Sequence, residues 1–413
     1  MPNDGGARPA PSIHYGWVIV VTGTLTAFAC LGLGRFALGM LLPSMGESLG
    51  LSYAKMGYIS TGNFVGYLAA VIAAAPLVRR LGERMTIAAA LLLVAVSMML
   101  VSQAGGFPQV LVLYVLTGMG SGAANVPIMA LVSHWFIRRH RGKAAGYIVC
   151  GSGLGIIVSG AVVPVVNAAA GAGGWRVNWL IFGAMALAAA AVCGALLRNR
   201  PEHKALAPYG QQPGDAADAG AEPLHQTPAS RRRLLAHLGA LYFLFGATYV
   251  IYVTFIVTAL VNERGFSEAA AGGFWMWVGI LSLLSGPLFG TLSDRIGRKG
   301  AVITVFALQM TAYGLVAAPL PVPFLYLSIG LFGIAVWSIP SIMAAAVGDY
   351  LGPEHAAAAF GTVTVIFGFD QIIGPAVAGA AADATGSFAS SFAMAAALAA
   401  LAIVLALFLR KPG

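Results

Sequence analysis

Two stretches of the chain decide its fold, because the second is a copy of the first. The first reads Ala75-Pro-Leu-Val-Arg79-Arg80-Leu-Gly82-Glu-Arg84, and the second reads Gly290-Thr-Leu-Ser-Asp294-Arg295-Ile-Gly297-Arg298-Lys299. Each is a short, charged, glycine-containing segment between two long apolar runs. The chain therefore contains an internal repeat, and the rest of the sequence is interpreted around it.

The copies are separated by a nearly constant number of residues. Arg79 set against Asp294 gives an offset of 294 − 79 = 215, and Gly174 against Gly386 gives 386 − 174 = 212. An offset that persists over six apolar runs predicts two parallel repeats, related by an axis along the membrane normal. Each repeat then holds an even number of membrane spans.

The composition indicates an integral membrane protein. Of the 413 residues, 59% are hydrophobic and only 9% are charged, and the mean hydropathy is +0.85. A soluble domain carries about 25% charged residues. The three cysteines lie in apolar runs and indicate neither a disulfide framework nor a metal site. We therefore predict an all-α membrane protein without cofactors.

Apolar runs long enough to cross about 30 Å of hydrocarbon occur twelve times, six on each side of a proline-rich, charged segment. We predict an N-terminal tail (1–16), a first half (17–197), a linker (198–234) and a second half (235–409). The predicted spans are 17–42, 53–75, 85–104, 108–134, 144–168, 177–197, 235–261, 269–292, 301–319, 323–348, 357–382 and 388–409.

Lysine and arginine are concentrated on one side of this predicted bundle. The short loops on the opposite side hold only Lys55, Arg176 and Arg264. By the positive-inside rule, both termini and the linker are cytoplasmic, as in a multi-pass protein of a bacterial inner membrane. The net charge of +9 is therefore a topology signal, and nucleic acid is not an expected partner.

The segment Gly290–Lys299 resembles the loop signature G-x-L-x-D-R-x-G-R-K of the major facilitator superfamily (MFS). The resemblance implies the MFS fold, with twelve transmembrane helices in two six-helix halves. In that family the loop is a conformational latch. The first copy departs from the signature, because Arg79 replaces the acid and Ala75 the glycine, so the second half is expected to carry the latch. The resemblance assigns this role to Gly290, Asp294, Arg295 and Gly297.

Other motifs are similar to those of the monocarboxylate and oxalate–formate transporter branch. They are His14-Tyr-Gly-Trp17, Trp135–Gly146 followed by Gly151-Ser-Gly153, and Gly374-Pro375 running into Asp383–Ser387. That branch usually places an arginine, and often an aspartate, in span 8, and span 8 has neither here. The Gly-Arg-Phe…Leu-Leu-Pro pattern of span 1 resembles instead a bacterial facilitator subgroup whose substrates are largely unassigned. The substrate therefore does not carry over from the resemblance.

One cation and one acid lie deep in the predicted spans. Arg35 is in span 1 and Asp370 is in span 11, which belong to opposite halves of this fold. A cation at this depth costs about 2.5–3.5 kcal/mol on insertion scales. One interpretation is a structural ion pair, whose disruption would cost about 3–5 kcal/mol. The other is functional: Arg35 binds a substrate anion, and protonation of Asp370 releases Arg35 to do so.

Uncharged polar and aromatic residues at membrane depth are further candidates for the substrate site. For each, the alternative role is helix–helix packing or an aromatic anchor at the membrane interface. The aromatic residues suit an organic substrate with an apolar body. The predicted substrate-binding residues, besides Arg35, are Asn63, Asn125, Tyr249, Tyr252 and Gln371.

Together these features predict a secondary active transporter that moves a small organic anion, such as a monocarboxylate, with proton coupling. We expect a monomer in the lipid bilayer whose partners are the substrate and protons. Efflux of amphipathic compounds is an alternative, and a non-transporting sensor on the same scaffold is another. No nucleotide-binding motif and no catalytic triad occurs in the sequence, so neither an ATP-driven pump nor an enzyme is predicted.

Overall fold

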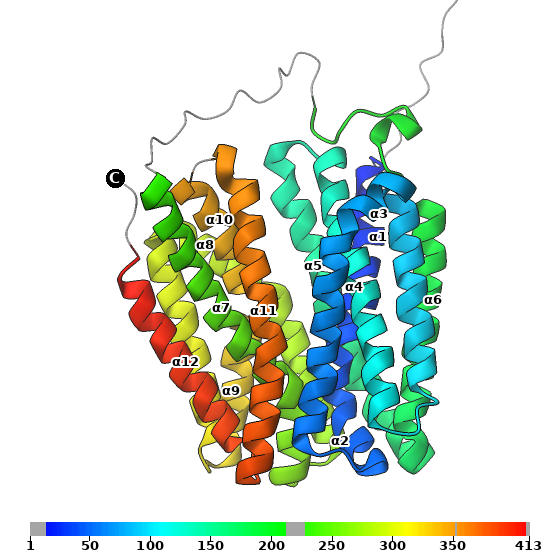
Figure 1. Cartoon of the computed structure of the whole chain (residues 1–413), viewed down its shortest axis with the longest axis vertical. Coiled ribbons are helices and arrows are strands. Elements are labelled where there is room, and N and C mark those ends of the chain that lie inside the picture. Colours follow the sequence, from blue (N-terminus) through cyan, green and yellow to red (C-terminus); the bar gives the residue numbers. More distant parts are fainter. Residues whose placement is uncertain (1–13, 212–227, 352, 410–413) are drawn as a thin grey trace, which may run out of the picture.

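The computed structural model describes residues 14–211, 228–351 and 353–409, which form a bundle of helices (Figure 1). Outside them lie most of the expected tail, the acidic middle of the expected linker, and residues 410–413. The first half contains α1 (Gly16–Ala27), η1 (Phe28–Phe36), α2 (Ala37–Leu49), α3 (Tyr53–Val101), α4 (Phe107–Trp135), α5 (Arg138–Ala170), η2 (Gly171–Gly173) and α6 (Gly174–Leu196). The second half contains α7 (Pro228–Thr258), η4 (Ala259–Glu263), α8 (Glu268–Ala317), α9 (Val322–Ala335), α10 (Ser338–Leu351), α11 (Pro353–Thr385) and α12 (Ala389–Leu407).

Within the described ranges, nine helical segments are long and apolar enough to cross a membrane. Three of these segments each contain two predicted spans. The backbone departs from the α-helical path between the two spans, at Gly82 in α3, at η2 between α5 and α6, and at Gly297 in α8. The predicted all-α bundle of twelve spans is therefore confirmed. The short helix η3 (Pro201–Lys204) lies in the expected linker, and α7 begins at Pro228, inside the range expected to be linker.

The sequence repeat recurs in the backbone of the turns. Six glycines with positive φ form three pairs whose numbers differ by 215: Gly50 and Gly265 (59° and 68°), Gly82 and Gly297 (74° and 83°), and Gly171 and Gly386 (58° and 74°). Side chains rarely tolerate this left-handed region, whereas glycine adopts it freely. Ser52 and Ser267, also 215 apart, cap the starts of α3 and α8 by accepting a hydrogen bond from a backbone N–H. The two halves therefore have left-handed glycines and serine helix caps at equivalent positions.

The two halves lean together at one end of the bundle (Figure 1). The end that holds the start of α1, the described part of the linker and the end of α12 is called the linker end here, and the opposite end is called the far end. At the far end, the Asp383 carboxylate of α11 accepts hydrogen bonds from Tyr53 N (2.7 Å) and Ala54 N (3.1 Å), at the start of α3. A carboxylate at a helix N-terminus is favourable, because the helix dipole and the free N–H groups both attract it.

Among the described residues, four more side-chain hydrogen bonds join the halves. They are Ser60 Oγ with Thr254 Oγ1 (3.3 Å), Thr61 Oγ1 to Ile372 O (2.7 Å), Asn167 Nδ2 to Glu268 Oε2 (2.8 Å) and Trp275 Nε1 to Ser159 Oγ (3.1 Å). Glycine permits this close packing, since a Cβ on Gly57 of α3 would lie 2.2 Å from Pro375 O of α11. The halves are thus held together on the far-end side of the bundle's middle.

We predict that Asp383→Ala loosens the far end. The variant loses a helix cap that is worth about 1 kcal/mol and that forms only when α3 and α11 meet, so the open population should rise about fivefold. Distances between spin labels at Lys55 and Val322, which are both exposed at the far end, measure the opening. Glu47→Ala removes an exposed far-end acid and serves as the matched control. An unchanged distance distribution in Asp383→Ala would show that this contact does not hold the end closed.

Candidate functional site

Arg35 lies on a π-helix. Residues Phe28–Phe36 (η1) interrupt the α-helical path of the first span, and such segments occur frequently at functional sites. Side chains of α4 bond the backbone carbonyls of this segment: Ser121 Oγ donates to Cys30 O (2.6 Å), and Tyr114 Oη donates to Arg35 O (3.0 Å). Helix α4 therefore stabilises the local distortion that carries Arg35.

The Arg35 side chain is held by an amide and two aromatic rings of α3. Its Nε donates to Asn63 Oδ1 (3.4 Å), while Asn63 Nδ2 donates to the carbonyls of Gly34 and Tyr114 (both 3.3 Å). The guanidinium carbon lies 4.5 Å from the ring centre of Phe64 and 4.2 Å from that of Tyr67. Cation–π contacts of this kind contribute about 0.5–2 kcal/mol when water is excluded. Asn63 thus positions Arg35.

The Arg35 guanidinium has no carboxylate partner among the described residues. Its Nη2 is buried and has no hydrogen-bond partner, and Arg35 takes part in none of the ion pairs that the described residues form. The structural ion pair with Asp370 considered from the sequence is not formed in this structure. A buried charge without a counter-ion is costly, and aromatic rings compensate it only in part. The position is therefore suited to an anion that comes from outside the chain.

Asp370 and Gln371 lie on α11, facing α7. The Asp370 side chain is fully buried, and neither carboxyl oxygen has a hydrogen-bond partner. The carboxyl packs against Gly246 of α7, where an added Cβ would lie 2.1 Å from Oδ1. Gln371 Oε1 accepts a hydrogen bond from Tyr249 Oη (2.8 Å). Arg35 and Asp370 both lie close enough to Tyr249 for their charges to act on its hydroxyl.

Trp337 occupies a break in the tenth span. The predicted span 323–348 is two helices here, α9 and α10, and the backbone N–H of Trp337 at the break donates to Ser285 Oγ (3.0 Å). The indole ring centre lies 5.2 Å from that of Phe36 and 5.9 Å from that of Tyr249. Its Nε1 is buried without a hydrogen-bond partner. Trp337 therefore joins the two halves beside Arg35 and keeps one donor free.

Asn125 joins the site through Tyr67, whereas Tyr252 lies elsewhere. Asn125 Nδ2 donates to Tyr67 Oη (2.8 Å), and its Oδ1 is buried without a partner. Tyr252 shares a hydrogen bond with Ser328 Oγ (2.8 Å) and stacks on Phe332 at 4.0 Å, in the core of the second half. Of the predicted substrate residues, the structure groups Arg35, Asn63, Asn125, Tyr249 and Gln371 around one centre, and Tyr252 is not among the residues that contact this group.

Sequence reasoning missed Phe64, Tyr67 and Gly246. Tyr67 lies four residues after Asn63, so the two share one face of α3, and that spacing could have identified it. Gly246 lies three residues before Tyr249 on α7. Its role follows only from the packing of α11, which the sequence does not reveal.

The predicted latch residues form contacts inside the second half. Arg298 donates to Asp294 Oδ1 (2.6 Å) and to Asp349 Oδ2 of α10 (2.7 Å). Burial alone would lower the pKa of Arg298, but the hydrogen bonds with Asp349 and Asp294 raise it above its ordinary value. Arg295 is exposed, and no hydrogen bond or ion pair to it occurs in the described part of the chain. Gly297 has the positive φ noted above, and a Cβ on Gly290 would meet nothing within 4 Å.

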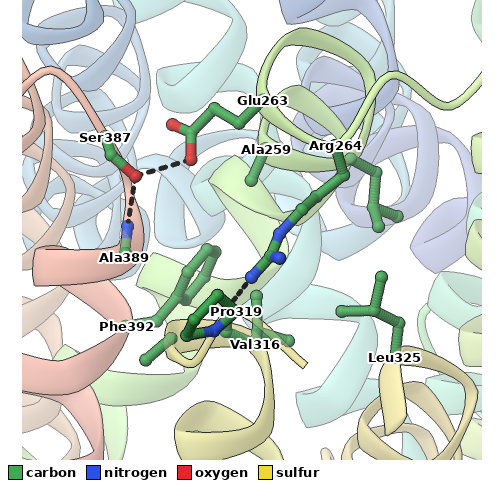
Figure 2. Close-up of a pocket in the computed structure, with 11 residues that line it drawn as sticks. Ala259, Glu263, Arg264, Val316, Pro319, Leu325, Ser387, Ala389 and Phe392 are labelled. Atoms are coloured by element: carbon green, nitrogen blue, oxygen red, sulfur yellow. Dashed lines mark hydrogen bonds between the residues drawn. The ribbon is translucent and has the colours of Figure 1, made fainter. Parts of the chain in front are cut away.

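Two cavities differ in their chemistry. A cavity of about 370 Å³ lies at the far end of the second half (Figure 2). Its two charged residues already have hydrogen-bond partners. Glu263 accepts from Ser387 and the backbone of Phe388, and Arg264 donates to backbone carbonyls at the end of α8. The cavity beside Arg35 measures only about 10 Å³, which is room for roughly one water molecule. The far-end cavity is therefore structural, and the site at Arg35 is contracted.

Comparison with known proteins gives one family. A sequence model of the family described as "Uncharacterised MFS-type transporter YbfB" matches residues 27–407. Similar curated proteins include the hexuronate transporter of Bacillus subtilis (24% identical over 372 residues, covering 84% of this chain and 83% of the relative). They also include monocarboxylate transporter 2 of Homo sapiens (22% over 401 residues, 92% and 82%) and the 4-hydroxybenzoate transporter PcaK of Pseudomonas aeruginosa (25% over 304 residues, 67% and 66%).

Solved structures agree on the fold. The nucleoside transporter NupG superposes with a TM-score of 0.70 at 15% identity, covering 96% of this chain and 98% of that one. A bacterial homologue of the human lysosomal transporter Spinster, in an inward-facing and occupied conformation, gives a TM-score of 0.70 at 14% identity, covering 96% and 95%. The fold implied by the loop signature is therefore confirmed.

We predict that Gly246→Ala destabilises the protein through Asp370. The new methyl group would lie 2.1–2.4 Å from the Asp370 carboxyl, and overpacking of this kind costs about 1–3 kcal/mol. Adding Asp370→Ala should restore most of the lost thermal stability, because it removes the clash. Gly361→Ala, on an open position of α11, should have little effect. A double variant no more stable than Gly246→Ala alone would exclude this contact as the cause.

Proposed function

This chain belongs to the MFS-type transporter family represented by YbfB, and we propose that it is a secondary transporter of a small organic carboxylate, driven by the proton gradient. The linker and both termini face the cytoplasm of a bacterial cell, and transport proceeds by alternating access between the two halves. Substrate binds at the centre formed by Arg35, Asn125, Tyr249 and Trp337.

The single observation that carries this proposal is the Arg35 guanidinium, whose buried Nη2 has no hydrogen-bond partner and which pairs with no carboxylate of the described residues. A carboxylate fits the planar fork of a guanidinium with two parallel hydrogen bonds, and such charged hydrogen bonds are about twice as strong as neutral ones. The similar curated proteins carry the names of carboxylates: hexuronate, monocarboxylate and 4-hydroxybenzoate. Those names support the substrate class, although each belongs to a protein that is at most 25% identical.

Asp370 is proposed as the proton carrier. Its carboxyl lies against Gly246 with no hydrogen-bond partner and no cation beside it. A buried carboxylate without a partner is unfavourable, so this position suits the protonated form. In another conformation the ionised carboxylate would need water or Arg35 as its partner. Proton binding and the position of α11 against α7 would thereby be coupled.

The arrangement of the halves supports a state that is closed to the outside. The side-chain hydrogen bonds between halves lie from the far end to the middle of the bundle, and Asp294 is engaged within its own half. We propose that Asp294 and Arg295 contact the first half when the cytoplasmic end closes, with Gly290 and Gly297 permitting the close approach and the sharp turn. The predicted latch would then act in the opposite conformation.

We predict that Arg35→Gln abolishes carboxylate uptake, reducing it at least a hundredfold, because the glutamine cannot balance the charge of the substrate. Uptake of labelled carboxylates into proteoliposomes measures this. Arg232→Gln, which removes an exposed arginine at the start of α7, should transport normally. If Arg35→Gln keeps carboxylate uptake, or instead improves export of amphipathic cations, an anion carrier is the wrong function and efflux of amphipathic compounds replaces it.

We predict that Asp370→Asn separates transport from the proton gradient. The amide mimics the protonated acid, so exchange of labelled for unlabelled substrate should continue, whereas accumulation driven by an imposed pH gradient should disappear. Both are measured in the same vesicles. Accumulation that remains proton-driven in Asp370→Asn would assign coupling to a different group.

A further inference from the structure

We propose that the substrate is a planar aromatic carboxylate with a hydroxyl group on its ring. This proposal rests on the proposed function and specifies the substrate class for the same site. The carboxylate binds Arg35 and Trp337, the ring lies among aromatic side chains of both halves, and the ring hydroxyl donates to Asn125.

Besides the carboxyl oxygens of Asp370, which is assigned to the proton, three buried polar atoms around the site lack hydrogen-bond partners. They are Nη2 of Arg35, Nε1 of Trp337 and Oδ1 of Asn125. Most buried polar atoms in folded proteins have a partner, and leaving one unsatisfied costs about 1–3 kcal/mol. Two donors and one acceptor therefore remain for a ligand. A carboxylate satisfies the two donors with its two oxygens, and the acceptor requires a ligand group that donates, such as a hydroxyl.

Contacts on both sides of Arg35 connect these atoms. On one side, the guanidinium lies 4.2 Å from the ring centre of Tyr67, whose hydroxyl bonds Asn125. On the other side, Phe36 follows Arg35 in the chain and its ring centre lies 5.2 Å from that of Trp337. Trp337 is therefore connected to the Arg35 position through Phe36, and Asn125 is connected to it through Tyr67. We accordingly assign the carboxylate to Arg35 and Trp337 and the ring hydroxyl to Asn125.

The body of the ligand would lie among rings. Phe36, Phe64, Tyr67, Tyr249 and Trp337 come from four different spans and meet at the guanidinium or at the indole. Offset or edge-to-face contacts between aromatic rings add about 0.5–1.5 kcal/mol each to the burial of area. A sugar acid would bring several hydroxyls that rings cannot satisfy, and a two- or three-carbon acid would leave these rings without an apolar partner. An aromatic ring meets both requirements.

Binding to the purified full-length protein tests this class with a matched ligand set: 4-hydroxybenzoate, benzoate, cyclohexanecarboxylate, lactate and glucuronate. We expect 4-hydroxybenzoate to bind about tenfold more tightly than benzoate, in line with one hydrogen bond to a buried acceptor. Benzoate should in turn bind more tightly than cyclohexanecarboxylate, which has similar size but no aromatic face. Titration calorimetry or thermal-shift curves in detergent measure the order.

Two variants assign the contacts to residues. Asn125→Leu removes the acceptor for the ring hydroxyl, so the ratio of the affinities for 4-hydroxybenzoate and benzoate should fall to about one. Trp337→Phe keeps a ring at the helix break but removes the donor, so it should weaken both aromatic acids about equally. Trp277→Phe, in α8, changes a tryptophan that is 56% exposed and serves as the control, with wild-type affinities expected.

The outcomes separate this proposal from the proposed function. If lactate or glucuronate binds best, or if cyclohexanecarboxylate binds as well as benzoate, the aromatic class is wrong while a carboxylate carrier stands. If Asn125→Leu keeps the preference for the ring hydroxyl, the assignment of that hydroxyl is wrong. If none of the five acids binds and Arg35→Gln transports as the wild type does, the proposed function fails as well.

Discussion

The centre of this molecule depends on one constraint: the positive charge of Arg35 lies at membrane depth and pairs with no carboxylate of the described residues. The side chains of α3 that contact the Arg35 guanidinium stabilise the cation without neutralising it: the amide of Asn63 accepts from Nε, and Phe64 and Tyr67 present their rings. The backbone around it is bent into a π-helix whose carbonyls are bonded by Ser121 and Tyr114. A transporter that binds an anion needs such a charge to stay available, and these contacts keep it so.

The acid of the other half is arranged in the opposite way. Asp370 has no cation beside it and fits into the space left by a glycine of α7. Arg35 and Asp370 are therefore not paired in this conformation, and the charges of both act on Tyr249. Because α7 and α11 belong to the same half, we propose that a change in the charge of Asp370 acts first on their packing. Thr61 of the first half bonds the backbone of α11 one residue beyond Gln371, so under this proposal a shift of α11 is passed to the first half there.

The sequence predicted those parts of the structure that depend on local chemistry. Glycine is required where φ is positive, so Gly82 and Gly297 marked equivalent turns, and the apolar runs gave the spans. Arg35 and Asp370 could also be identified from the sequence, because each is a charged residue within a long apolar run. The π-helix at Arg35 and the break at Trp337 were not visible, because side chains of other helices stabilise them. Gly246 was missed because its role depends on which residue of α11 faces it.

The claim that Arg35 binds a carboxylate is tested most directly by comparing the protein's affinity for a carboxylate with its affinity for the corresponding uncharged amide. Benzoate and benzamide have nearly the same shape, so the difference in their affinities for the purified protein reports the charge alone. We predict that the wild-type protein binds benzoate at least a hundredfold more tightly than benzamide, and that Arg35→Gln binds the two about equally. Equal affinities for the wild-type protein would contradict the central role given to this guanidinium.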